Sequence, residues 1–211
     1  VIIPGTDLSE QISTAGMEAS GTGNMKLAAN GALTIGTDDG ANVEMRKSVT
    51  DQWWPFLFGK SAEENVEMHK KHNYNPLDIY AKHPEIKRAL NALCDGFLTE
   101  NSSEHEALLS VYNSLMQGPP GVIADRFFVL NDLLDYYETQ KKVDQLYQTP
   151  LKWAEYALHN IAGMGPFSSD NSIKNYTKHI WELKKCGPNL KELKKIKEQY
   201  SENDRCRVIP S

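Results

Sequence analysis

The sequence has no excess of positive charge. Its 211 residues include 23 Lys and Arg against 28 Asp and Glu, so the formal net charge at pH 7 is −5. Proteins that bind nucleic acid usually present a basic face. We therefore expect no nucleic-acid partner.

Long apolar runs are also missing. No segment approaches the roughly 18 apolar residues of a membrane-spanning helix, and no basic stretch followed by a short apolar run indicates a signal peptide at the start. Cysteine is scarce: Cys94, Cys186 and Cys206 are far apart, odd in number and without metal-ligand spacing. Such cysteines are typical of reduced thiols in a cytoplasmic protein. We expect neither a membrane partner nor a metal site.

What the sequence does contain is typical of a globular domain, with 40% apolar and 24% charged residues. Short apolar runs predict buried strands at residues 1–4, 32–36, 53–58 and 126–130. Apolar spacing of threes and fours predicts helices at residues 65–71 (behind a Ser61 cap), 84–93, 105–116, 133–146 and 151–161, and one more capped by Ser169-Asp170. Strands that alternate with helices imply parallel pairing, so the expected fold class is α/β with a helix-rich second half.

The breaks in the pattern are short, and they indicate one domain over residues 1–182 followed by a basic helical tail over residues 183–211. Leu190, Leu193 and Ile196 form one stripe in that tail. This pattern favours a solvated terminal helix over a helix that docks on a partner. The chain starts in an apolar run and without methionine, so we expect it to be a piece of a longer protein.

The segment from Glu18 to Gly31, EASGTGNMKLAANG, is the main local motif. The dinucleotide fingerprint G-x-G-x-x-G fails there, because Lys26 stands in place of the third glycine. The P-loop pattern G-x-x-x-x-G-K-[ST] also fails, because Thr22 follows Gly21 where a lysine is required. Both nucleotide motifs are therefore excluded.

The same segment still suits an anion. Gly21 and Gly23 permit backbone conformations in which successive N–H groups converge on an anion. We expect Asn24 to cap a short helix that ends at Asn30-Gly31 and has Lys26 in its first turn. The Lys26 amine could serve as a counter-ion or as a nucleophile. On the residues alone, an ordinary turn is an equal alternative.

Longer stretches resemble a known family. EASGTGNMK at 18–26, NGALTIGT at 30–37 and DGANVE at 39–44 closely resemble the pyridoxal-phosphate site of the glycogen and maltodextrin phosphorylases. Shorter landmarks follow in the family's order: FLFG at 56–59, DRF at 125–127, FSSD at 167–170 and IW at 180–181. The resemblance implies that this chain is the C-terminal part of the second Rossmann-like domain of a two-domain, GT-B type glycosyltransferase.

The resemblance also implies roles for individual residues. The cofactor would be pyridoxal 5′-phosphate, held by Lys26 as a Schiff base, with the N–H groups of Thr22 and Gly23 on its phosphate. Glu18, with the backbone of Ser20 and Gly21, would hold the hydroxyls of the glucosyl unit. The implied reaction is phosphorolysis of terminal α-1,4-linked glucose to α-glucose-1-phosphate with retention, in which the cofactor phosphate relays the proton.

The implied partners are an α-1,4-glucan, inorganic phosphate, the N-terminal part of the same enzyme and a second subunit. Lys26 is the only cation of the motif, and Arg46 and Lys47 are the next along the chain. Two adjacent phosphates need more positive charge than that. We therefore expect the 211-residue piece to be inactive by itself. A non-catalytic, helix-rich interaction domain with a relic cofactor loop is the alternative function.

Three departures from the family pattern concern packing near the motif. Asp38 stands where a bulky apolar residue is usual, Ala28-Ala29 replace larger side chains, and Pro55 removes a hydrogen-bond donor from the expected strand at 53–58.

Two weaker motifs have simpler explanations. His69 and His72 suit a solvated helix face better than a metal site, and Asp38-Asp39-Gly40 lacks the spaced oxygens of a calcium loop.

Overall fold

The computed structural model of the chain describes residues 2–184 and 186–203. Val1 and Cys206 lie outside the described residues. The chain divides into two compact units, the first ending at Phe167 and the second beginning at Ser168. The functional division into a catalytic part, 1–182, and a tail, 183–211, stays a prediction. None of the described helices is long and apolar enough to cross a membrane.

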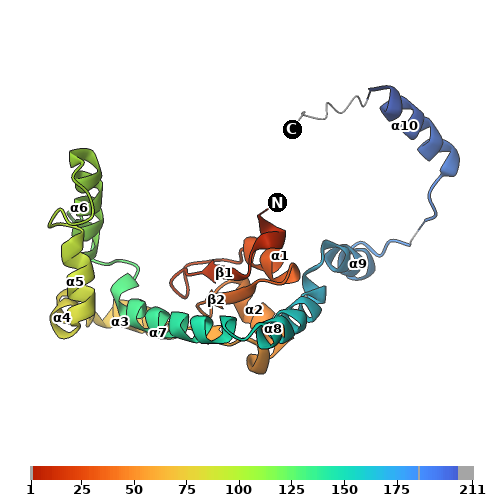
Figure 1. Ribbon diagram of the computed structural model, residues 1–211. Helices are drawn as coiled ribbons and strands as arrows, with labels where there is room; N and C mark the ends of the chain where they lie inside the picture. Colours follow the sequence, from red (N-terminus) through yellow and green to blue (C-terminus); the bar gives the residue numbers. More distant parts are fainter. Residues whose placement is uncertain (1, 185, 204–211) are drawn as a thin grey trace. The chain divides into compact units, whose positions relative to one another are not determined.

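The first unit is built on a small parallel sheet (Figure 1). In the described residues its three strands are β1 (Leu8–Gln11), β2 (Leu33–Gly36) and β3 (Phe56–Leu57), in the order β1-β2-β3. Leu8 pairs with Leu33, and Ile35 pairs with Phe56. The parallel α/β prediction is therefore confirmed. β3 is shorter than the predicted strand because residues 51–53 form a 3₁₀ turn, and Pro55 precedes the ladder without interrupting it.

Two predicted strands are wrong. Residues 3–5 form a 3₁₀ turn next to Pro4, and the pairing strand is β1, whose polar residues sequence patterning does not mark as a strand. Residues 126–130 run into a helix instead of a strand. The buried Asp125 carboxylate accepts the N–H groups of Val129 and Leu130 at 2.8 and 2.9 Å, which caps that helix.

Helices make up most of the remaining chain. In the first unit they are α1 (Gly23–Ala29), α2 (Ala41–Val49), α3 (Ala62–Lys71), α4 (Pro76–Lys82), α5 (Pro84–Ala92), α6 (Ser102–Met116), α7 (Val129–Tyr147) and α8 (Pro150–Gly163). The second unit contains α9 (Ser169–His179) and α10 (Leu190–Asn203). All the predicted helices are confirmed, and α3 begins with the Ser61 cap. The cap of α9 is Ser168, one residue before the predicted one, because its side chain accepts the N–H of Asp170.

Two buried clusters hold the sheet and its flanking helices together. One packs the sheet residues Leu33, Ile35 and Phe56 against α7 and α8, which follow one another along the sheet in Figure 1. The other lies among α1, α2 and α8 and contains Ala28, Ala41, Met45, Val49, Trp54 and Met164. Ala28 has no exposed surface, so a small residue fits this tightly packed place. These clusters fix the positions of α1 and α2.

Candidate functional site

The two halves of the motif meet at the carboxyl edge of the sheet. Residues 12–22 follow β1, and residues 37–40 follow β2. In open α/β sheets, ligands bind outside the carboxyl ends of the strands. The fold therefore brings 18–26 and 37–44 together at the edge where a ligand is expected.

Hydrogen bonds join these two loops directly. The Asp39 carboxylate is only 8% exposed and accepts the N–H groups of Gly16, Met17 and Glu18 at 2.9, 3.2 and 2.9 Å. The N–H of Ala41 donates to the Ser20 carbonyl at 2.7 Å. The loop after β2 therefore fixes the backbone of the loop after β1 through these hydrogen bonds.

Glu18, Ser20 and Gly21 lie together in one turn of the loop after β1. The exposed Glu18 carboxylate accepts the Ser20 N–H at 3.3 Å, and the Ser20 hydroxyl donates to the Gly21 carbonyl at 3.2 Å. Gly21 has φ of 86°, in the left-handed region that favours glycine. This turn can offer a sugar both a carboxylate acceptor and backbone polar groups.

Thr22, Gly23 and Lys26 belong to the beginning of α1. Thr22 is the N-cap residue, and its carbonyl accepts the Lys26 N–H at 3.2 Å, which closes the first turn. Residues four apart lie on one helix face, and helical side chains lean toward the N-terminus. The exposed Lys26 side chain therefore shares a face with Thr22 and leans toward the loop. Lys26 is therefore placed so that its amine can reach the loop before α1.

The prediction that Asn24 caps α1 is wrong. The helix begins at Gly23, so Asn24 already lies inside its first turn. The buried Asn24 amide donates to Asn42 Oδ1 at 2.9 Å, and the Asn42 amide donates to the Thr37 carbonyl at 3.1 Å. Asn24 therefore ties α1 to α2. The end of α1 at Asn30 is confirmed.

A phosphorylated aldehyde cofactor fits the residues present. Gly23 has φ outside the left-handed region, and a Cβ built there would meet no atom within 4 Å. The chain's own packing therefore does not require glycine at this position. The missing side chain leaves open space beside the first N–H groups of α1, which lack intrahelical partners. Such a cofactor needs space for an oxyanion, N–H donors and a primary amine, and this segment offers all three.

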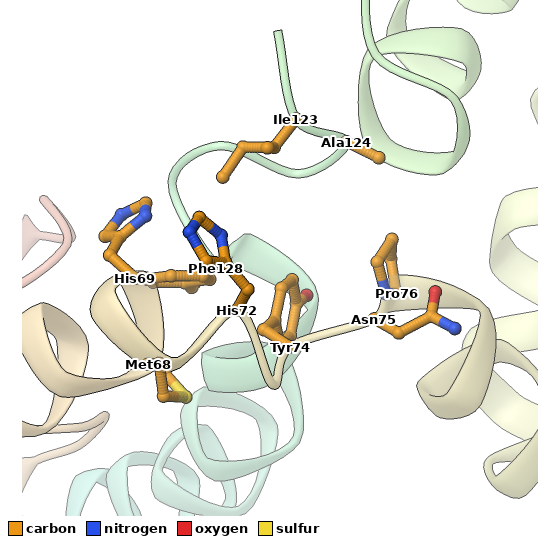
Figure 2. Close-up of a pocket in the computed structure, with 9 residues that line it drawn as sticks. All are labelled: Met68, His69, His72, Tyr74, Asn75, Pro76, Ile123, Ala124 and Phe128. Carbon is orange, nitrogen blue, oxygen red and sulfur yellow. The ribbon is translucent and has the colours of Figure 1, made fainter.

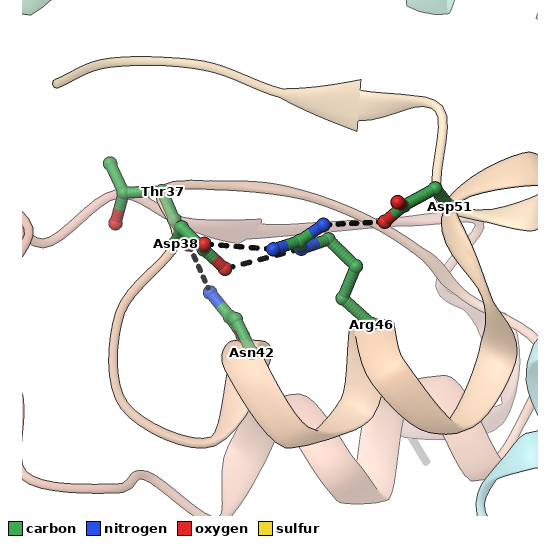
Figure 3. Close-up of polar contacts among 5 residues, drawn as sticks. All are labelled: Thr37, Asp38, Asn42, Arg46 and Asp51. Carbon is green, nitrogen blue, oxygen red and sulfur yellow. Dashed lines mark hydrogen bonds and ion pairs between the residues drawn. The ribbon is translucent and has the colours of Figure 1, made fainter. Parts of the chain in front are cut away.

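The first arginine along the chain after the motif, Arg46, is already paired with carboxylates (Figure 3). Arg46 on α2 contacts Asp38 through Nη2 at 2.9 Å and Nε at 3.2 Å, and it also pairs with Asp51. Hydrogen bonding to Asp38 is the main cause that raises the Arg46 pKa. This pairing explains how a charged side chain is accommodated at position 38. It also leaves Arg46 matched by two negative charges.

Several cavities formed by the described residues lie outside this motif. One of about 320 Å³ is lined by His69, His72 and Tyr74 among others (Figure 2). Burial raises the pKa of Tyr74, whose hydroxyl donates to Asp125. Within residues 2–184 and 186–203, no group of three His, Cys, Asp or Glu side chains could hold a metal ion. The histidines therefore have no third ligand there.

A smaller cavity, of about 160 Å³, lies near the sheet edge between Ile12, Phe58 and Val129. Its lining includes the buried Asp132, and burial raises the pKa of that carboxyl group. Asp132 Oδ1 accepts the Lys60 N–H at 3.3 Å and the Asn131 amide at 3.1 Å. Asp132 thus helps to hold the segment after β3.

Sequence reasoning gives Asp39 and Asn42 no individual role in the site, although both lie in the run DGANVE at 39–44. Both residues are buried and polar, and both contact the motif from the next loop. The available signal was their position directly after a buried strand, where polar residues meet at the carboxyl edge of a parallel sheet. In the sequence, Asp39 is part of the run DGANVE that resembles the family and of a calcium-like run, but neither gives it an individual role.

The fold and the motif together define a class of protein. A parallel sheet whose carboxyl edge carries two joined loops and an exposed lysine is typical of an α/β ligand-binding domain. Comparison with known proteins then identifies the family. The model of the family described as Carbohydrate phosphorylase matches residues 1–183, so the chain belongs to that family.

Curated relatives agree with the family match. The chain is 46% identical over 182 residues to a glycogen phosphorylase of Chlamydia pneumoniae. It is 43% identical over 180 residues to the muscle form of human glycogen phosphorylase. These matches cover 86% and 85% of the chain but only 21% and 20% of the two relatives. The chain therefore spans about one fifth of the length of the curated relatives it matches.

Proposed function

We propose that this chain is the C-terminal part of a cytoplasmic α-glucan phosphorylase of the GT-B type. Inorganic phosphate attacks the terminal α-1,4-linked glucosyl residue of a glucan and releases α-glucose-1-phosphate with retention. The observation that carries the proposal is the run from Glu18 to Lys26, present in full and folded at the carboxyl edge of the sheet. The full-length enzyme is expected to be a homodimer.

Lys26 is assigned to carry pyridoxal 5′-phosphate through its amine. The N–H groups of Thr22 and Gly23 are assigned to its 5′-phosphate, which the open space at Gly23 can admit. When bound, the cofactor supplies a phosphate monoester whose second pKa, near 6, suits proton transfer at neutral pH. These residues hold that phosphate beside the sugar-binding turn.

Glu18 is assigned to the glucosyl hydroxyls, together with the backbone of Ser20 and Gly21. A glycosidase would need a pair of carboxyl groups flanking the scissile bond. Here a phosphate takes over the proton transfer, so Glu18 is a hydrogen-bond acceptor and not the general acid. Its exposed position in the loop after β1 is compatible with this role.

The assigned reaction places two phosphates side by side, and their repulsion must be offset. Two unit charges about 5 Å apart repel by roughly 3 kcal/mol at an effective dielectric constant of 20. Lys26 is engaged by the cofactor, and Arg46 is paired with Asp38 and Asp51. The balancing cations therefore come from the remainder of the enzyme, and this chain alone is expected to be inactive.

The test is an assay with two proteins: the full-length enzyme and the 211-residue chain. Each receives pyridoxal phosphate, an α-1,4-linked oligosaccharide primer and glucose-1-phosphate, and released phosphate is measured. We expect release by the full-length enzyme and none above the blank by the chain. No release by the full-length protein would support the interaction domain with a relic loop. Release by the chain near the full-length rate would show that its positive charge is misassigned.

A further inference from the structure

The loop that carries Glu18 is folded around one buried carboxylate. Asp39 Oδ1 accepts the Gly16 N–H at 2.9 Å, and Oδ2 accepts the N–H groups of Met17 and Glu18 at 3.2 and 2.9 Å. Consecutive backbone N–H groups that converge in this way form an anion-binding concavity. In this chain the concavity is filled from within, by a side chain 21 to 23 residues away in sequence.

The residue after Asp39 touches the same turn. A Cβ built on Gly40 would lie 2.6 Å from the Ser20 carbonyl oxygen and 3.0 Å from Glu18 Cγ. The next N–H, that of Ala41, donates to the Ser20 carbonyl at 2.7 Å. Residues 39–41 therefore form a surface on which Glu18 and Ser20 lie, and a shift of Asp39 would move the Glu18 side chain.

The helix that carries Lys26 has different supports. Asn24 is held by Asn42, and Ala28 is packed against Met45 in the cluster shared by α1, α2 and α8. The interactions described for α1 do not include the Asp39 carboxylate. The turn with Glu18 and the helix with Lys26 can therefore be disturbed separately.

We propose that Asp39 is a positioning residue for the sugar: it fixes Glu18 for the glucosyl hydroxyls and is not needed to hold the cofactor on Lys26. This inference rests on the proposed function. It goes beyond it by naming a residue that acts through Glu18 from a different loop. Asp39 itself has no assigned contact with the sugar or the cofactor.

Asp39→Asn in the full-length enzyme tests the proposal. The amide has the same shape, but it replaces one acceptor oxygen with a donor that faces N–H groups. We expect kcat/KM for glucose-1-phosphate to fall on the order of 100-fold, mainly through KM. Cofactor content per subunit should match that of the wild type. Hydrogen exchange at the amides of Gly16, Met17 and Glu18 should become faster.

Asp38→Asn is the matched control, because it makes the same charge change one residue earlier. The Asp38 carboxylate contacts Arg46, as Figure 3 shows, and the hydrogen bonds described for it do not include the Glu18 loop. We expect wild-type kcat/KM, cofactor content and amide exchange at residues 16–18. Gly40→Ala approaches the same turn from the neighbouring residue, and it should reproduce the loss of sugar affinity with full cofactor content.

Wild-type kinetics in Asp39→Asn would overturn the proposal. Loss of cofactor together with sugar affinity in both Asp39→Asn and Gly40→Ala would also overturn it. The turn with Glu18 and the helix with Lys26 would then act as one unit. If the wild-type enzyme itself does not turn over glucose-1-phosphate, the proposed function fails. The exchange rates at residues 16–18 would still decide whether Asp39 holds the loop.

Discussion

Adjacent carboxylates have different tasks at the end of β2. Asp38 is partly exposed and pairs with Arg46, whereas Asp39 is buried and accepts three backbone N–H groups. Glu18 differs from both, since it is exposed and accepts a single N–H of its own turn. The three carboxylates illustrate that residue type alone does not assign a role. Burial and partners separate a surface ion pair, a loop support and a candidate sugar contact.

Glu18→Gln tests the sugar contact at the level of one residue. Loss of a charge-assisted hydrogen bond costs about 1.5–3 kcal/mol, so turnover of glucose-1-phosphate by the full-length enzyme should fall roughly 10- to 150-fold. Cofactor content should be unchanged, because the residue is not assigned to the cofactor. Glu63→Gln, an exposed position on α3, is the control with the same charge change. Unchanged kinetics at full cofactor occupancy would remove Glu18 from the sugar site.

At the scale of elements, α8 supports α2 and, through α2, the helix α1 that carries Lys26. Its last residue, Gly163, approaches α2 so closely that a Cβ there would lie 2.5 Å from Val49 Cγ2. The Gly163 carbonyl also accepts the Ser48 hydroxyl at 2.6 Å, and the Asn160 amide donates to the Trp53 carbonyl at 2.8 Å. α8 therefore fixes α2, which in turn holds Asn24 of α1 through Asn42.

Gly163→Ala should weaken this packing. Overpacking of a tight contact typically costs about 1–3 kcal/mol, so the free energy of unfolding of the chain in urea should decrease by that amount. Gly165→Ala is the matched control, since a Cβ there would meet no atom within 4 Å and its φ is not in the left-handed region. Equal stability of the two variants would show that the contact between α8 and α2 is not tight.

The elements that sequence patterning predicted well are those with strong local signals. The helices with regular apolar spacing were found, and the Ser61 cap was placed correctly because its capping box with Glu64 is local. The strand at 126–130 was wrong because Asp125 caps a helix there through N–H groups four and five residues on. β1 was missed because its burial is imposed by the paired β2 and not by its own sequence.

The same distinction applies to the site. The run from Glu18 to Lys26 is contiguous, and its glycines and lysine can be found from sequence alone. Asp39 could not be assigned, because its contacts join residues more than 20 positions apart and depend on the parallel pairing of β1 and β2. The error at Asn24 has a similar cause. Asn24 lies inside the first turn of α1, where its Oδ1 accepts the Met25 N–H, and its amide donates to Asn42 on α2.

At the scale of the whole molecule, the chain belongs to the carbohydrate phosphorylase family and spans about one fifth of the length of the relatives it matches. It contains the lysine that we assign to the cofactor, the turn that we assign to the sugar, and the residues that support both. The cations that would offset two adjacent phosphates are assigned to the remainder of the enzyme. The central claim that residues of this chain can test is therefore the identity of the lysine that carries the cofactor.

Borohydride reduction of the full-length enzyme loaded with pyridoxal phosphate, followed by digestion and mapping of the tagged peptide, tests that claim most directly. Reduction fixes the cofactor to the amine that carries it. We predict the tag on Lys26 alone, and no stoichiometric tag in Lys26→Ala. A stoichiometric tag on a different lysine of the wild-type enzyme, or a tag retained in Lys26→Ala, would contradict the account.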